Sequence, residues 1–174
     1  MYELNRLMVA LDLSEMDETL IKYTAFIANL IKVEQVYFIH VQKFLDIPED
    51  LKAELYGDSS QPIDELLQAR MQENVEKFFK NHKEFNTEFI IVEGTQLTQL
   101  LHWSHIKKID LFVTGHKKRS QGSGVLPNRL ARRAACSVLF VPENASLKCE
   151  KIFVGLDFSK NSRFALNKAI GIAK

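Results

Sequence analysis

Residues 8–29 read MVALDLSEMDETLIKYTAFIAN, and this stretch joins a short apolar run to a segment with helical periodicity. The run ends in Leu-Asp-Leu-Ser, after which apolar residues recur every three or four positions. Such a change of period predicts a strand that leads directly into a helix. Ser14 is a good N-cap residue, so we expect the helix to span Met16–Leu30.

Apolar runs of strand length recur along the chain, with helix-period segments between them. The predicted strands are Leu7–Leu11, Val36–Val41, Glu88–Val92, Leu111–Thr114 and Val138–Val141. The other predicted helices are Pro62–Lys80, Thr95–Ile106 and Leu126–Ala134. The strand runs are nearly continuous rather than alternating, which is typical of strands buried on both faces of a parallel sheet. Alternation of strand and helix therefore predicts an open α/β sheet with helices on both faces.

One predicted connection is long, at Gln42–Gln61. Connections of this length are uncommon in compact domains unless they have local structure or a function. Two interpretations stay open for it: a surface excursion, or a lid or interface arm.

The opening motif returns at residues 153–174, FVGLDFSKNSRFALNKAIGIAK, where Asp157 falls 145 residues after Asp12. A strand and one helix cannot enclose a core of their own. We therefore expect a complete domain at residues 1–142, a linker at 143–150, and the first strand and helix of a second, truncated copy at 151–174. The polypeptide would then be a piece of a tandem protein. We expect its strand at 151–157 to pack on another surface, for example across a dimer, or to be disordered.

Composition argues against two classes of partner. The chain is 46% hydrophobic and 26% charged with a net charge of +1, so no overall field attracts it to nucleic acid or to a membrane surface. No apolar stretch approaches the roughly 20 residues that span a bilayer, and the N-terminus has acids where a signal peptide has basic residues. We expect a cytoplasmic protein with no nucleic-acid or membrane partner.

Two loops after predicted strands carry chemically distinctive residues, in the region where open parallel sheets bind ligands. Asp12 follows the first strand, and it either caps the next helix or accepts hydrogen bonds from a ribose or a base. The second loop, at 115–124, is rich in glycine and basic residues. Six basic residues and no acid lie between Lys117 and Arg133, which suits phosphate oxygens. The alternative is a solvated basic loop, since neither GxxxxGK[ST] nor GxGxxG is present.

Four segments together resemble the universal stress protein family: VALDLS, FIHV, DLFVTGH and GSGVLPNRLARRAACSVLFVP. The resemblance covers residues 5–142, and residues 151–174 are similar to the start of a second copy in tandem members. It implies a five-stranded parallel sheet in the order 3-2-1-4-5, an adenine-nucleotide alpha-hydrolase-like fold. It also implies a stress-induced cytoplasmic protein, often a homodimer or pseudo-dimer through the last strand. One branch of the family binds ATP and another does not.

The resemblance also implies a nucleotide site. Adenine and ribose contacts would fall on residues 10, 12 and 41. The family's phosphate signature, G-x2-G-x9-G-[ST], begins at Gly115, but Lys118 stands where its second glycine is expected and the loop is four residues shorter. Gly122-Ser123 could replace the final Gly-Ser if two residues are inserted before the helix. The implied site residues are Ala10, Asp12, Val41, Gly115, Lys117, Lys118, Gly122, Ser123, Gly124 and Val125.

Two functions follow as hypotheses. The first is a regulatory module that binds ATP or another adenine nucleotide, with Mg²⁺ as an ion that can accompany it. The second is a non-nucleotide stress protein that acts through dimerisation and protein partners. An enzyme is not expected beyond weak nucleotide hydrolysis, because the sequence has no acid and base at motif spacing, no metal-ligand cluster and no nucleophile elbow. His116, beside the basic loop, is an isolated candidate.

Overall fold

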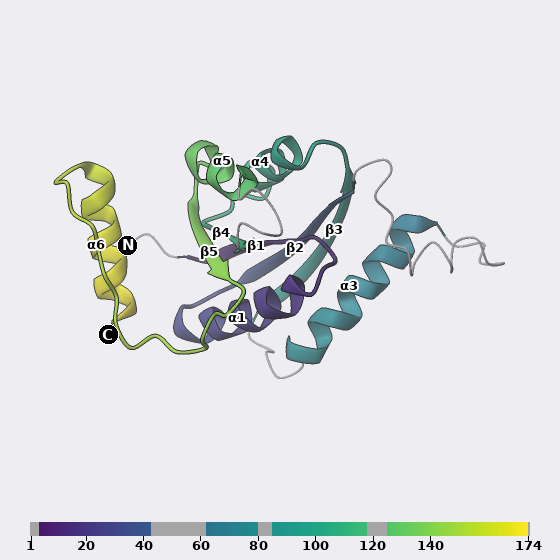
Figure 1. The fold of residues 1–174 in the computed structure, drawn as a ribbon, viewed down its shortest axis with the longest axis horizontal. Helices are drawn as coiled ribbons and strands as arrows, with labels where there is room; N and C mark the ends of the chain where they lie inside the picture. The colour runs from purple at the N-terminus through teal and green to yellow at the C-terminus, as the bar shows by residue number, and fades with distance from the viewer. Residues whose placement is uncertain (1–3, 43–61, 80–84, 118–124, 174) are drawn as a thin grey trace.

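The fold is that of a computed structural model, which describes residues 4–42, 62–79, 85–117 and 125–173 (Figure 1). Most of the long connection, residues 43–61, lies outside the described residues. Four predicted site residues also lie outside them: Lys118, Gly122, Ser123 and Gly124. Within the part of the chain that is described, no helix is both long enough and apolar enough to cross a membrane.

Five parallel strands form one sheet in the order β3-β2-β1-β4-β5, which confirms the predicted fold class. The strands are β1 (Arg6–Leu11), β2 (Gln35–Gln42), β3 (Asn86–Glu93), β4 (Leu111–His116) and β5 (Ser137–Pro142). Each lies within two residues of its predicted bounds at either end. The chain builds outward from β1 through β2 to β3, and then crosses back to add β4 and β5 on the other side. The strand order therefore reverses between β1 and β4, where open parallel sheets bind ligands.

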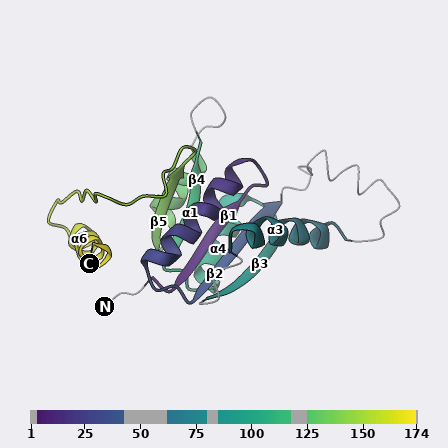
Figure 2. The ribbon, with the colours of Figure 1, turned by 90° about the horizontal axis from the view of Figure 1, so that it is seen from below.

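Helices cover both faces of the sheet (Figure 1, and Figure 2 from below). On one face lie α1 (Met16–Leu30) and α3 (Ile63–Phe79), and on the other lie α4 (Gln96–Ile106) and α5 (Val125–Arg133). The bounds of α1 are those predicted, and the other three helices shift by one residue at most. Ser14 was predicted to be the N-cap of α1, but Glu15 takes that place. The Ser14 Oγ still accepts the N–H of Met16, at 3.3 Å.

Two apolar cores result, one on each face of the sheet. Along β1, Leu7 and Val9 pack into the core beneath α1 and α3, whereas Met8 packs into the core beneath α4 and α5. All three side chains are fully buried. Because both faces of the central strand are covered, its apolar run is uninterrupted, as the sequence predicted.

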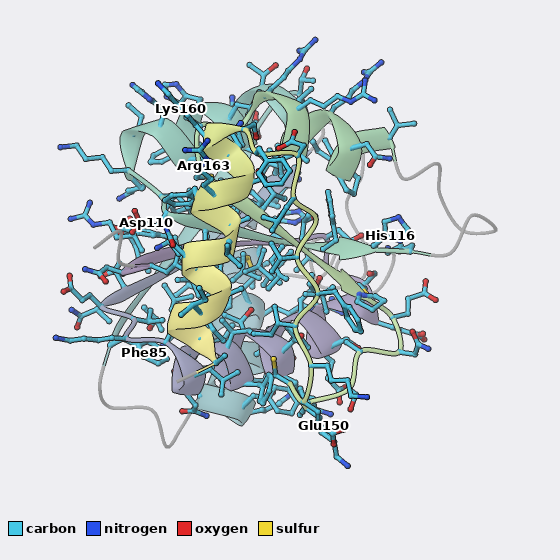
Figure 3. All side chains as sticks on the ribbon, turned by 90° about the vertical axis from the view of Figure 1, so that its left-hand side faces the viewer. Phe85, Asp110, His116, Glu150, Lys160 and Arg163 are labelled. Carbon is cyan, nitrogen blue, oxygen red and sulfur yellow. The ribbon has the colours of Figure 1, made fainter. Side chains whose placement is uncertain are left out.

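The second copy of the opening motif forms its helix but not its strand. Helix α6 (Lys160–Ile172) is present, whereas residues 151–157 are in no strand of this single chain. Their packing across a dimer stays a prediction. A strand forms only where a neighbouring strand satisfies its backbone groups, and none of the described strands pairs with this segment. The segment and α6 stand apart beyond β5 (Figure 1), and Figure 3 shows the chain running from Glu150 alongside the helix.

The turn between strand and helix nevertheless has the same form in both copies. Leu13 and Phe158 have φ angles of 60° and 62°, in the left-handed region that non-glycine residues rarely adopt. The Asp12 N–H donates to the Asp17 carboxylate, and the Asp157 N–H donates to the hydroxyl of Ser162 at 3.4 Å. The turn thus forms from its own residues, without a sheet. The division into a domain, a linker and a second copy stays a prediction.

Candidate functional site

A cleft of about 200 Å³ opens at the carboxyl end of the sheet, where the strand order reverses. It contains every predicted site residue that the structure describes: Ala10, Asp12, Val41, Gly115, Lys117 and Val125. These residues come from the ends of β1, β2 and β4 and from the start of α5, so the fold gathers segments far apart in the sequence. Their role in binding a ligand stays a prediction.

Other residues of the cleft were not predicted from the sequence. They are Leu11, Met16, Leu20, Ile39, Gln96, Leu100, Thr114, Leu126 and Pro127. Most are apolar residues at positions that also face a core, so periodicity does not separate them from ordinary core residues. Gln96 and Thr114 are polar. Gln96 is the first residue of the helix that follows β3, and this position after a strand is the feature of the sequence that could have indicated it.

A cluster of three polar side chains closes one side of the cleft. The Lys117 Nζ donates to Asp12 Oδ2 at 2.7 Å and to Ser14 Oγ at 3.1 Å. Ser14 in turn donates both its hydroxyl and its backbone N–H to Asp12 Oδ1. The cluster therefore joins the end of β1 to the end of β4. Asp12 does not cap α1, because its side chain is held by Lys117 and Ser14, so the capping interpretation was wrong.

The Asp12 carboxylate is ionised at neutral pH. Partial burial by itself raises the pKa of Asp12, but hydrogen bonds from Lys117 and Ser14 outweigh burial and hold that pKa below its ordinary value. The cleft thus carries a paired negative and positive charge at its mouth, both accessible to a ligand.

A second carboxylate, Asp17, lies beneath the same loop. Its Oδ1 accepts the N–H of Asp12 at 3.0 Å, and its Oδ2 accepts the N–H of Leu13 at 2.8 Å. Asp17 is only 5% exposed, and this burial, together with the nearby Asp12 charge, raises the pKa of Asp17 to about 7 in spite of the two donors. Asp17 therefore holds the left-handed turn that presents Asp12.

Two histidines near the site do not act as ligand groups of the cleft. His40 is buried, and its Nδ1 lies 3.0 Å from the carbonyl oxygen of Leu11. Burial lowers the pKa of His40, so the ring is neutral and Nδ1–H donates to that carbonyl. His116 is exposed at the end of β4 (Figure 3) and lies against Phe140 with ring centroids 6.2 Å apart. It does not line the cleft.

The arrangement suits a small molecule with a flat apolar part and polar substituents. Apolar side chains from both helical layers form the walls, while Asp12, Lys117, Gln96 and Thr114 supply polar groups. The described part of the chain has no group of three His, Cys, Asp or Glu residues that could hold a metal ion.

The model of the universal stress protein family matches residues 3–142. The chain belongs to the universal stress protein family. Solved structures of universal stress proteins have the same fold. The protein UspA from Lactobacillus plantarum has 17% identity and a TM-score of 0.58, over 80% of this chain and 99% of that chain.

Universal stress proteins with a bound nucleotide are among the similar structures. One, in complex with cAMP, has 16% identity and a TM-score of 0.57, over 82% of this chain and 100% of that chain. A family member from Arabidopsis thaliana with AMP bound has 16% identity and a TM-score of 0.51, over 81% of this chain and 93% of that chain. At such low identities the likeness shows the shared fold alone. No curated protein matches the chain significantly in sequence.

Proposed function

We propose that this universal stress protein is a cytoplasmic regulatory module that binds ATP or another adenine nucleotide in the cleft between β1 and β4. The observation that carries the proposal is the paired Asp12 and Lys117 at the mouth of an apolar cleft, at the point where the strand order reverses. AMP and cAMP in structures of the same fold support an adenine nucleotide as the ligand.

We assign a part of the nucleotide to each side of the cleft. Ala10 and Val41, at the ends of neighbouring strands, offer an apolar surface to the base. Asp12 is an acceptor for the ribose hydroxyls. Lys117 is a donor for the phosphates, and the N-terminus of α5 adds a partial positive charge beside them.

The proposed role is binding rather than catalysis. An acid or base for hydrolysis would have to lie within hydrogen-bond reach of the phosphates. His116, the isolated candidate, lies outside the cleft, and Asp12 is assigned to the ribose rather than to the phosphates. We propose that any Mg²⁺ arrives bound to the phosphates of the nucleotide.

Calorimetry on protein stripped of nucleotide tests this function. We expect ATP to bind at submillimolar concentration and Gly115→Val to weaken this binding at least about tenfold. A Cβ at Gly115 would lie 2.9 Å from Met16 Cγ and 3.2 Å from Met16 Cε, so the larger side chain must push Met16 into the cleft or occupy the cleft itself.

Gly155→Val is the matched control, because a Cβ at Gly155 meets no atom within 4 Å. This variant should bind ATP as the wild-type protein does. Absence of heat with ATP, ADP and AMP at millimolar concentration would contradict the proposed function.

A second candidate function, association with another copy of the chain, is favoured by the apolar surface before α6. Phe153 is 91% exposed, whereas its counterpart in the first copy, Met8, is fully buried. Leu156 is 48% exposed, whereas its counterpart Leu11 is 4% exposed. Exposed apolar surface of this kind marks interaction sites. We propose that it packs against the same segment of a second chain, because residues 151–157 are in no strand and pair with none of the described strands.

Sedimentation of the wild-type chain and of the double variant Phe153→Ser/Phe158→Ser tests this association. We expect the wild type to dimerise at micromolar concentration and the variant to be monomeric, since Phe158 is also 79% exposed. A wild-type chain that stays monomeric up to high micromolar concentration would rule the association out. Dimerisation through the last strand, which the family resemblance implies, would instead leave the double variant dimeric.

A further inference from the structure

Gln96 is a polar side chain at a position where helix α4 faces the sheet. It lies four residues before Leu100, so both side chains are on the same face of the helix. Leu100 is only 3% exposed and packs in the core beneath α4 and α5, together with Ile39 and Val41 of β2. Gln96 lies nearer the start of the helix, where this face lines the cleft. A polar residue at a core-facing position departs from the apolar pattern, and such departures are expected at functional sites.

The amide of Gln96 is not used by the fold. Its side chain is half-buried in the wall of the cleft, and no hydrogen bond joins it to any described residue. Gln99 differs, because its Nε2 donates to the carbonyl oxygen of Glu93 at 2.9 Å and so ties α4 to the end of β3. The Gln96 amide therefore keeps two N–H donors and one acceptor oxygen for a ligand.

Gln96 and the charged pair of the cleft come from opposite sides of β1. Lys117 follows β4, which lies on one side of β1, and Asp12 follows β1 itself. Helix α4, which begins at Gln96, packs over β2 on the other side of β1. A nucleotide with its ribose at Asp12 and its phosphates at Lys117 would therefore extend its base past Ala10 toward Gln96.

We propose that Gln96 reads the base of the nucleotide and makes the cleft select 6-aminopurines. The amide oxygen accepts a hydrogen from the exocyclic amino group of adenine, and Nε2 donates to the ring nitrogen beside that group. Glutamine forms such a paired contact with adenine because each edge presents one donor and one acceptor in matching order. This inference rests on the proposed nucleotide-binding function and adds to it the side chain that recognises the base.

The test compares ATP with purine riboside triphosphate, in which a hydrogen replaces the 6-amino group. A paired contact of this kind changes affinity by roughly 5- to 100-fold. We expect the wild type to bind ATP at least about fivefold more tightly than the analogue, and this ratio to fall at least about threefold in Gln96→Leu. Leucine fits the apolar period of α4, so the variant should keep the fold.

The ratio of the two affinities separates recognition of the base from a structural effect. A change in the shape of the cleft weakens both ligands alike, whereas loss of a contact with the amino group weakens ATP more than the analogue. Gln72→Leu is the matched control, because Gln72 is exposed on α3, over the opposite face of the sheet, and should leave both affinities unchanged. The side-chain amide signal of Gln96 in ¹⁵N–¹H NMR spectra, assigned by its absence in Gln96→Leu, should shift more with ATP than with the analogue.

An unchanged ratio in Gln96→Leu would overturn the inference and leave the proposed function standing. Equal affinities of the wild type for ATP and the analogue would have the same consequence, since the amino group would then not be recognised. Failure of the wild type to bind either ligand would overturn both the inference and the proposed function.

Discussion

Replacing Phe38 by alanine is expected to lower the free energy of unfolding by about 4 kcal/mol. Phe38 is fully buried on β2, next to the central strand. Its ring meets Phe79 of α3 edge to face, with centroids 5.5 Å apart, and stacks on Phe89 of β3 at 5.7 Å. Truncation therefore removes the apolar burial of one large ring, leaves a cavity, and loses two aromatic contacts.

Urea unfolding followed by circular dichroism measures this loss, and an unchanged m-value would show that the compactness of both states is retained. Phe158→Ala is the matched control, because that ring is 79% exposed and its removal should change the stability by less than about 0.5 kcal/mol. A loss below about 1 kcal/mol for Phe38→Ala would mean that this ring does not pack between β3 and α3.

The stability of the protein is expected to fall between about pH 4 and pH 7 through Asp17, by an amount on the order of 4 kcal/mol. The pKa of Asp17 is raised to about 7 in the folded protein, from an ordinary value of 3.8, chiefly by burial. Between these two values the folded state binds a proton that the unfolded state has released. Stability therefore falls as the pH rises through this window, and protonation of Asp17 favours the folded state.

The measurement is urea unfolding of the wild type and of Asp17→Asn from pH 4 to pH 8. Other titrating groups are common to both proteins, so the difference between the two curves isolates Asp17. We expect the wild type to lose stability relative to Asp17→Asn as the pH rises, with the steepest change below pH 7. Parallel curves would contradict the raised pKa. Asp12 has the opposite effect on the dependence of stability on pH. Because its pKa is lowered in the folded protein, its ionised form contributes stability that is lost only as the pH falls below about 4.

Asp17 also connects stability to the proposed site. Its carboxylate accepts the N–H groups of Asp12 and Leu13, the two residues that turn the chain at the cleft. The counterpart in the second copy of the motif is Ser162, whose hydroxyl accepts the N–H of Asp157. A neutral side chain thus holds the turn of the second copy.

The predicted elements agree closely with the observed ones because their signals are local. The apolar runs marked all five strands, and α1 begins and ends where its periodicity predicted. The strand order came from the resemblance to the universal stress proteins, and the structure confirms it. The N-cap prediction for Ser14 failed because several side chains compete for the same loop: Ser14 binds Asp12, and Asp17 satisfies the loop N–H groups.

The cleft was predicted in part. Asp12 and Gly115 were predicted as site residues because they lie at or after the ends of strands, and the carboxyl ends of parallel strands share one edge of the sheet. Gln96 and Thr114 were missed, because a polar residue near a strand or helix end is common and only its neighbours in space reveal a site. The bond between Asp12 and Lys117 joins residues 105 positions apart, and no periodicity encodes such a contact.

The two copies of the opening motif separate what local sequence determines from what requires the assembled fold. Both copies form the same left-handed turn and the following helix, since hydrogen bonds between residues within a few positions are sufficient for them. Only the first copy forms a strand. Residues 6–11 have β2 and β4 as neighbours, whereas residues 151–157 have no neighbour among the described strands. The N–H and C=O groups of a strand form hydrogen bonds with neighbouring strands, which come from other parts of the chain. The formation of β1 therefore depends on tertiary structure. The same holds for the cleft and for the charged residues at its mouth.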